Sequence, residues 1–381
     1  MITFFRTTTA LALLAASLPA GAASATVTRA WQYKPESVEG LAVQNLIGDI
    51  RVERGTDPGV HITATTTVES GTQAEAERLA GLIDYRTTDI GAGSKFAVHL
   101  PQEHFPKIYW ENGASSWWSV SFVEYFGERI RLTDDKSKAP VVRVNLLIRA
   151  PAGAKLEVSN LFGEIAAQGY SGQLKLDVGS GLLKSTAGEG EITLDNGSGE
   201  VVVVGHRGRV VADTGSGSVK ITDCECEILA DTGSGSVDVR GGKGSVSADT
   251  GSGRVEVEGF SGAFAADTGS GSVRARGLSN VTSLEADTGS GSVTIEGDLS
   301  ALAQLRIDTG SGSVSLRSPA QPSMEIRIDT GSGGVDVEAP GATVQERDDI
   351  WTVRMKEGTG RGDIDTGSGS VDIEFKGDVP L

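Results

Sequence analysis

Acidic side chains at a regular spacing are the residues of this sequence best suited to do chemistry. The pentapeptide Asp-Thr-Gly-Ser-Gly occurs eight times, beginning at Asp213, Asp231, Asp249, Asp267, Asp287, Asp308, Asp329 and Asp365. Two looser copies begin at Asp177 and Asp195. A carboxylate can act as a general acid or base, or it can bind a cation such as Ca²⁺. The spacing of the copies indicates whether catalysis or cation binding fits this sequence better.

The first use is catalysis by a pair of carboxyl groups. Asp-Thr-Gly-Ser resembles the loop of aspartic proteases, in which two copies face each other and share one proton. Here the Asp positions from Asp177 to Asp267 are 18 residues apart, and the later steps are 20, 21, 21 and 36. Copies at such a period should stack in a line and not converge on one water molecule. We therefore expect no enzymatic activity and no cofactor.

The second use is cation binding. Stacked Asp side chains would lie about 4.8 Å apart and repel each other by roughly 0.9 kcal/mol in a water-like medium. We expect Asx turns to offset this repulsion, each Asp accepting the amide of the Gly two residues later. Weak Ca²⁺ binding is the alternative, because the repeat offers one acid and some hydroxyls per copy. Its candidate ligands are Asp213, Asp231, Asp249, Asp267, Asp287 and Asp308.

The only two cysteines, Cys224 and Cys226, are separated by one glutamate. In an oxidising compartment they could form a disulfide, although closure between residues i and i+2 is expected to be strained. Two thiols alone do not make a zinc site. The repeat alignment directs Cys224 inward and places Cys226 where other copies carry a turn glycine.

The residues around each pentapeptide predict the elements that position it. An apolar residue follows the Asp at two sites spaced by two, so both side chains lie on one face of a strand. The first site holds Val219, Val237, Val255, Val273, Val293, Val314, Val335 and Val371. The second holds Ile221, Val239, Val257, Ala275, Ile295, Leu316, Val337 and Ile373. Alternating apolar residues before each Asp predict a second strand, whose inward face the Thr continues.

Each copy is therefore a coil of two short strands and two turns. Gly-Ser-Gly makes one turn. The second corner should hold a third inward side chain, at Tyr170, His206, Cys224, Phe260 and Leu278. Such short strands are stable only when coils stack and share a core. The period predicts an all-β fold, a single-stranded right-handed β-solenoid with coils of about 18 residues. The repeats should occupy residues 159–381, with a hairpin interruption near 346–356.

The N-terminus predicts export. Residues 1–25 read as a signal peptide, with a basic Arg6, an apolar run from Ala10 to Leu18 and an Ala23-Ser24-Ala25 cleavage site. We expect no transmembrane anchor, because the apolar run is too short and no later segment is long enough. The protein should lie in the periplasm, outside the cell or on its surface. Its net charge of −17 makes nucleic acid a poor partner.

Residues 26–158 should form a small irregular N-terminal part in which the solenoid starts. Residues 44–52 match 159–165 in their Asn, Gly, acidic and Ile positions, which predicts a first coil here. Residues 73–83 should form the one helix, with Ala76, Leu79, Ala80 and Ile83 on its apolar face.

Residues 101–140 form an insertion rich in aromatic side chains. We favour a hydrophobic cap over the open end of the solenoid. A partner-binding face is the alternative, because Trp and Tyr are enriched at interfaces. Its candidate residues are Trp110, Trp117, Trp118 and Tyr125.

The layout resembles the DUF4097 family, an adhesin family of the bacterial envelope. The resemblance rests on the signal peptide, on residues 43–50, on the helix near residue 78, on residues 150–156 and on the Gly-Ser-Gly coils. It implies a β-solenoid at the cell envelope, with proposed roles in adhesion or envelope stress and no agreed active site. The Trp-rich insertion is a departure from the family layout.

Together these features predict an exported, non-enzymatic envelope protein. It would act as an adhesin-like module or scaffold that binds an envelope protein or a glycan through its solenoid surface. A Ca²⁺-stabilised repeat protein and, less favoured, a polysaccharide-acting β-helix enzyme are the alternatives. End-to-end self-association is a further expectation.

Overall fold

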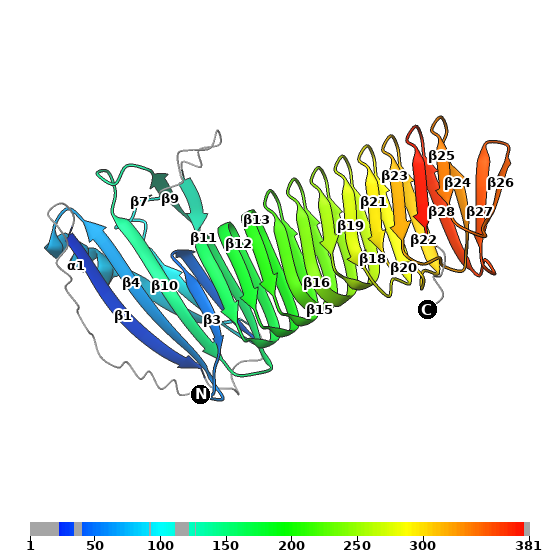
Figure 1. The fold of residues 1–381 in the computed structure, drawn as a ribbon. Helices are drawn as coiled ribbons and strands as arrows, with labels where there is room; N and C mark the ends of the chain where they lie inside the picture. The colour runs from blue at the N-terminus through cyan, green and yellow to red at the C-terminus, as the bar shows by residue number, and fades with distance from the viewer. Residues whose placement is uncertain (1–22, 34–39, 91–92, 111–121, 126, 377–381) are drawn as a thin grey trace. The chain divides into compact units, whose positions relative to one another are not determined.

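The fold was analysed in a computed structural model, which describes residues 23–33, 40–90, 93–110, 122–125 and 127–376 (Figure 1). The chain forms two compact units, Met1–Lys184 and Ser185–Leu381. Nearly all of the predicted signal peptide, together with Trp117 and Trp118, lies outside the described residues. The predicted boundary between residues 158 and 159 stays a prediction. The architecture is all-β with one described helix, as predicted.

The first unit builds its core from long strands and one amphipathic helix. β1 pairs antiparallel with β4 and β4 with β10, whereas β10, β3 and the second half of β11 run parallel. α1 begins after the capping Thr72 and buries Ala76, Leu79 and Ala80, the face predicted from the sequence. The elements are β1 (Ala23–Tyr33), β2 (Leu41–Ile47), β3 (Ile50–Arg54), β4 (Val60–Ser70), α1 (Gln73–Leu82), β5 (Asp84–Ile90), β6 (Gly93–His99), β10 (Val141–Ala150), β11 (Ala154–Gln168) and β12 (Ser171–Thr186).

The first coil lies where the matched segments predicted it. β2 pairs in parallel with β11, with Asn45 opposite Asn160, and β3 pairs with the second half of β11, with Ile50 opposite Ile165. Both asparagines are buried and donate from Nδ2 to a backbone carbonyl of a neighbouring segment. Asn45 donates to Val144 of β10 at 2.8 Å, and Asn160 donates to Gly48, between β2 and β3, at 2.6 Å. The matched Asn therefore ties one layer to the next.

The second unit is a stack of coils in which each strand pairs in parallel with its equivalent in the next coil (Figure 1). Val219 lies opposite Val237 and Val237 opposite Val255, an offset of 18 residues. The elements are β13 (Glu189–Val204), β14 (Arg207–Thr214), β15 (Val219–Thr232), β16 (Val237–Thr250), β17 (Val255–Glu258), β18 (Ser261–Thr268), β19 (Val273–Leu278), β20 (Ser283–Thr288), β21 (Val293–Gly297), β22 (Gln304–Thr309), β23 (Val314–Ser318), β24 (Met324–Asp329), β25 (Val335–Glu338), β26 (Thr343–Arg347), β27 (Ile350–Met355), β28 (Gly360–Thr366) and β29 (Val371–Phe375).

The core of the second unit is the predicted ladder of apolar side chains. The two apolar sites after each Asp are at most 1% exposed in the coils from Val219 to Leu316 and again at Val371 and Ile373. The second-corner residues, such as Phe260 and Leu278, are buried as predicted. Val335 and Val337 are the exceptions, since both are partly exposed.

The end of the stack departs from the order of the sequence. The last coil, β28 and β29, does not follow the coil of β24 and β25. Instead β28 lies between β22 and β24, and β29 lies between β23 and β25. The predicted hairpin is present as β26 and β27, and β27 pairs antiparallel with the outer edge of β24. With that edge occupied, the returning chain pairs with the inner edge of β24.

The repeated corner is held by the threonine and not by the aspartate. The Thr250 hydroxyl donates to the carbonyl of Gly235 in the preceding coil at 2.9 Å, and it accepts the amide of Gly253 in its own corner at 2.9 Å. Thr232, Thr268, Thr288 and Thr309 make the same pair of bonds. All of these threonines are buried.

The predicted Asx turns are therefore wrong for most of the column. The amide of Gly251, two residues after Asp249, donates to the backbone carbonyl of Thr232 at 3.2 Å, and the equivalent glycines of the other inner coils do likewise. Asp329 does accept the expected amide, that of Gly331, at 3.4 Å. The carbonyl of the coil below is a competing acceptor that the isolated sequence does not reveal.

We expect Thr250→Val to lower the free energy of unfolding by about 1–3 kcal/mol, because it leaves a buried carbonyl and a buried amide without their partner. Thr250→Ser, which keeps the hydroxyl, should recover most of this loss. Thr222→Val, on the outward face of β15, is the matched control and should change stability by less than about 0.5 kcal/mol. Urea denaturation measures all three. Equal losses for both valine variants would contradict the role of the hydroxyl.

Candidate binding surface

The corners of the second unit present a repeated polar surface, which we name the corner ridge. In each inner copy the Thr is buried, whereas the Gly and Ser that follow it are exposed and the Asp is exposed or partly exposed. The parallel register places Asp213 beside Asp231 and Asp249 beside Asp267, and the Ser of each copy follows its Asp by three residues. The ridge comprises Asp213, Ser216, Asp231, Ser234, Asp249, Ser252, Asp267, Ser270, Asp287, Ser290, Asp308 and Ser311. It offers carboxylates and hydroxyls at the spacing of the coils.

Two aspartates of this row have a pKa raised by partial burial and by neighbouring carboxylates. The pKa of Asp231 lies above its usual value, first because of partial burial and then because of Asp249 and Asp213. Asp267 shows the same shift, from partial burial and from its neighbours Asp249 and Asp287. The expected repulsion is therefore present in the column, and it favours ligands that bring positive charge or donate hydrogen bonds.

The six candidate Ca²⁺ ligands fall in this single row. Among the described residues, no group of three or more Asp, Glu, His or Cys side chains converges as a metal site would require. The strand register instead places these aspartates beside one another in successive coils. Calcium binding at Asp213, Asp231, Asp249, Asp267, Asp287 and Asp308 stays a prediction.

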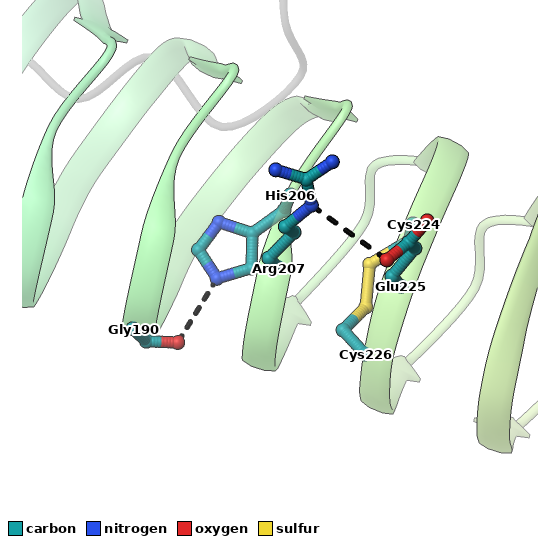
Figure 2. Close-up of a disulfide and its surroundings, with 6 residues drawn as sticks. All are labelled: Gly190, His206, Arg207, Cys224, Glu225 and Cys226. Atoms are coloured by element: carbon teal, nitrogen blue, oxygen red, sulfur yellow. Dashed lines mark hydrogen bonds and ion pairs between the residues drawn. A yellow bond between two sulfur atoms is a disulfide. The ribbon is translucent and has the colours of Figure 1, made fainter.

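Cys224 and Cys226 form a disulfide at the second corner (Figure 2). Their Cα atoms are 5.4 Å apart, which is within the usual range for disulfides. Both are buried, and Cys226 lies in register with Gly208 and Gly244, the turn glycine predicted from the repeat. Glu225 between them is exposed and forms ion pairs with Arg207 at 3.6 Å and with Lys243 at 3.5 Å. The bond closes a corner inside the stack.

His206 occupies the same corner of the preceding coil (Figure 2). Its Nε2 donates to the carbonyl of Gly190 at 3.1 Å, and burial lowers its pKa. A Cβ at Gly188 would lie 2.8 Å from Nδ1 of this ring, so a larger residue there would force the ring to move. The predicted packing of His206 at an inward corner is therefore observed.

The aromatic insertion of the first unit forms a small sheet of β7 (Lys107–Tyr109), β8 (Phe122–Tyr125) and β9 (Glu128–Thr133). Tyr125 is only 5% exposed and donates its hydroxyl to the carbonyl of Val98 at 2.7 Å, so its side chain packs in the fold. Trp110 is partly exposed and stacks on Phe162, with ring centroids 4.7 Å apart. Phe122 is 42% exposed, a surface aromatic that the candidate set did not include.

Comparison with known proteins gives one family. The family described as Toastrack DUF4097 matches residues 144–374, which is more than half of the chain. The chain belongs to the Toastrack DUF4097 family. The match covers the second unit almost completely, so the repeated coils are the part of this chain that the family shares. No curated protein matches.

Two solved structures are similar to this member of the Toastrack DUF4097 family. One is a "putative cell adhesion protein" from Clostridium sporogenes ATCC 15579, at 11% identity over 92% of this chain and 99% of that chain, with a TM-score of 0.18. The other is a "putative lipid binding protein" from Parabacteroides distasonis ATCC 8503, at 10% identity over 90% and 96%, with a TM-score of 0.29. At these scores neither bears on the ligand. No described helix has the length and apolarity needed to cross a membrane.

We expect Asp267→Asn to stabilise the protein at neutral pH by less than about 1 kcal/mol, because it removes one member of a repelling row. A raised pKa means that the folded state binds more protons than the unfolded state, so the penalty grows as pH rises above the ordinary Asp pKa of about 3.9. The gain should vanish near pH 3 and shrink in high salt, as measured by urea denaturation. Asp349→Asn, outside the row, is the control. A gain of equal size at pH 3 would contradict this electrostatic cause.

Proposed function

We propose that this protein is an exported, non-enzymatic binding module of the cell envelope, built as a right-handed β-solenoid with coils of about 18 residues. The 18-residue register of β15 to β19 supports the coil size, and the preferred hand of parallel crossovers supports the right-handed turn. The in-register exposure of Asp and Ser along the corner ridge carries the functional part of the proposal.

The corner ridge suits an extended partner with its own repeat. Hydroxyls and carboxylates at one spacing can accept and donate hydrogen bonds along a chain of sugar units or along a polar protein surface. The corners carry glycine and serine and no bulky side chain, so a partner can approach the backbone closely. We therefore propose an envelope glycan or an envelope protein as the ligand class.

Two features of the chain support export. The first is the predicted signal sequence in residues 1–25, and the second is the disulfide between Cys224 and Cys226, because such bonds persist in oxidising compartments. We propose a periplasmic or surface location on these grounds. The aromatic insertion, through Trp110 and the neighbouring Trp117 and Trp118, is the second candidate surface.

The ridge is tested by replacing three of its serines, Ser234, Ser252 and Ser270, with arginine. Co-sedimentation with an envelope fraction should fall at least tenfold, because the long side chains cover the corner. The matched control replaces Leu229, Ser247 and Ala265 with arginine. These residues point outward in the same three coils and add the same charge, so the control should retain binding.

Two further results decide the site and the ligand class. Treating the envelope fraction with protease or with glycosidases distinguishes a protein ligand from a glycan. A chain that lacks residues 106–136 should still bind if the ridge is the site. If that deletion abolishes binding while the ridge variant retains it, the ridge is not the binding surface.

A further inference from the structure

The stack of coils in the second unit ends on an open strand edge. In every coil before the end, the amide of the first inward valine donates to a backbone carbonyl of the next coil. Val293 donates to Ser313 at 3.0 Å, Val314 to Ser370 at 2.9 Å, and Val371 to Gly334 at 2.9 Å. Val335 is the next valine of this series. Its strand, β25, pairs only with β29, so the amide and carbonyl groups of its other edge have no strand partner among the described residues.

The side chains of β25 show the same interruption. Val335 and Val337 occupy the two inward sites that are buried in the preceding coils, yet both are partly exposed. The opposite sheet extends further, by the two antiparallel strands β27 and β26 (Figure 1). Trp351 of β27 lies opposite the buried Ile328, and Val344 of β26 lies opposite the buried Val353 and is 41% exposed. One more strand beside β25 would continue the stack over these apolar groups.

The charges on the outer face indicate which strand would fit. The residue after the second inward site alternates in sign along the stack, through Arg240, Glu258, Arg276, Glu296, Arg317 and Glu374. Neighbours of opposite sign form ion pairs, as between Arg276 and Glu296 at 3.7 Å and between Arg317 and Glu374 at 3.4 Å.

The alternation breaks at the open edge. Glu338 of β25 lies beside Glu374, so two acids are adjacent there. Asp336 and Glu338 are both exposed, and neither forms an ion pair within the described residues. The next position in this row calls for a positive charge.

We propose that the open edge of β25 binds an extended segment of a partner protein, in which Val, Ile or Leu alternate with Arg or Lys. The segment adds a strand to the sheet, places its apolar side chains over Val335, Val337 and Trp351, and places its basic side chains beside Asp336 and Glu338. A second copy of this chain fits less well through this edge, because two antiparallel β25 strands would bring their own acids together. The inference rests on the proposed binding role and assigns it a partner class at a separate site.

The test measures peptide binding to the whole chain by fluorescence polarisation at about 0.15 M salt, where exposed charges are largely screened beyond about 8 Å. The probes are the labelled peptides Gly-Val-Arg-Val-Arg-Val-Gly and Gly-Val-Glu-Val-Glu-Val-Gly. The basic peptide should bind at least tenfold more tightly than the acidic one. Glu338→Lys should remove this preference. Val337→Pro, which removes an amide of the open edge and spares the pairing with β29, should weaken the basic peptide at least tenfold.

Glu191→Lys is the matched control, since Glu191 is exposed on β13, outside the corner ridge, and its replacement changes the net charge equally. It should leave the affinity for the basic peptide within twofold, and thermal melting should show every variant folded. Equal loss in Glu191→Lys and Glu338→Lys would reveal nonspecific charge attraction and overturn the proposal. So would equal binding of both peptides or binding of neither.

Two other occupants of the edge are tested by sedimentation and by one truncated chain. If sedimentation shows a dimer of the unmodified chain that Val337→Pro abolishes, the edge belongs to a second copy. If a chain ending at Lys376 binds the basic peptide and the full chain does not, residues 377–381 cover the edge. Either result overturns the proposal. Failure at this edge leaves the corner ridge untouched, because the arginine substitutions in the ridge are tested separately.

Discussion

The hydrogen bond from a threonine hydroxyl to the coil below is the interaction on which the repeated structure depends. Thr250 joins the carbonyl of Gly235 to the amide of Gly253, and this bridge recurs from coil to coil. The bridge requires very close approach, since a Cβ on Gly253 would overlap the backbone carbonyl oxygen of Gly235. The glycine lets the two backbones approach closely, and the threonine hydroxyl donates the hydrogen bond between the coils. The register of all other side chains follows from this contact.

Strict register has an electrostatic consequence. It places identical residues beside each other, so Asp231 and Asp267 each meet two more carboxylates. The pKa of both is raised, first by partial burial and then by these neighbours. On the strands the sequence alternates instead, and Arg276 lies between Glu258 and Glu296. The corner ridge therefore carries negative charge that no ion pair balances among the described residues and that a ligand could offset. On the strand faces, Arg and Glu of adjacent coils balance each other. The end of the stack, where the alternation stops at Glu338, is the second place with unbalanced charge.

Much of this architecture was predictable from the sequence, because aligning the repeats shows which positions are apolar in every copy and therefore face inward. The valine ladder, the buried second corner, the helix after Thr72 and the match between Asn45 and Asn160 all follow from local pattern. The acceptor of the corner amide was not predictable. The amide of Gly251 could donate to its own Asp249 or to the carbonyl of Thr232, and the second acceptor belongs to another coil. The placement of β28 between β22 and β24 was missed for a similar reason, because identical repeats carry no information about which neighbours pair.

The most direct test of coil-on-coil stacking is a set of pulsed electron paramagnetic resonance distances between nitroxide labels at Ser216 and at a second corner serine. With about 4.8 Å per coil, the label at Ser311 should lie roughly 24 Å away, that at Ser368 roughly 29 Å and that at Ser332 roughly 34 Å. This order places Ser368 closer than Ser332, against their order in the sequence. A shorter distance to Ser332 than to Ser368, or distances that do not increase by one coil at a time, would contradict the account.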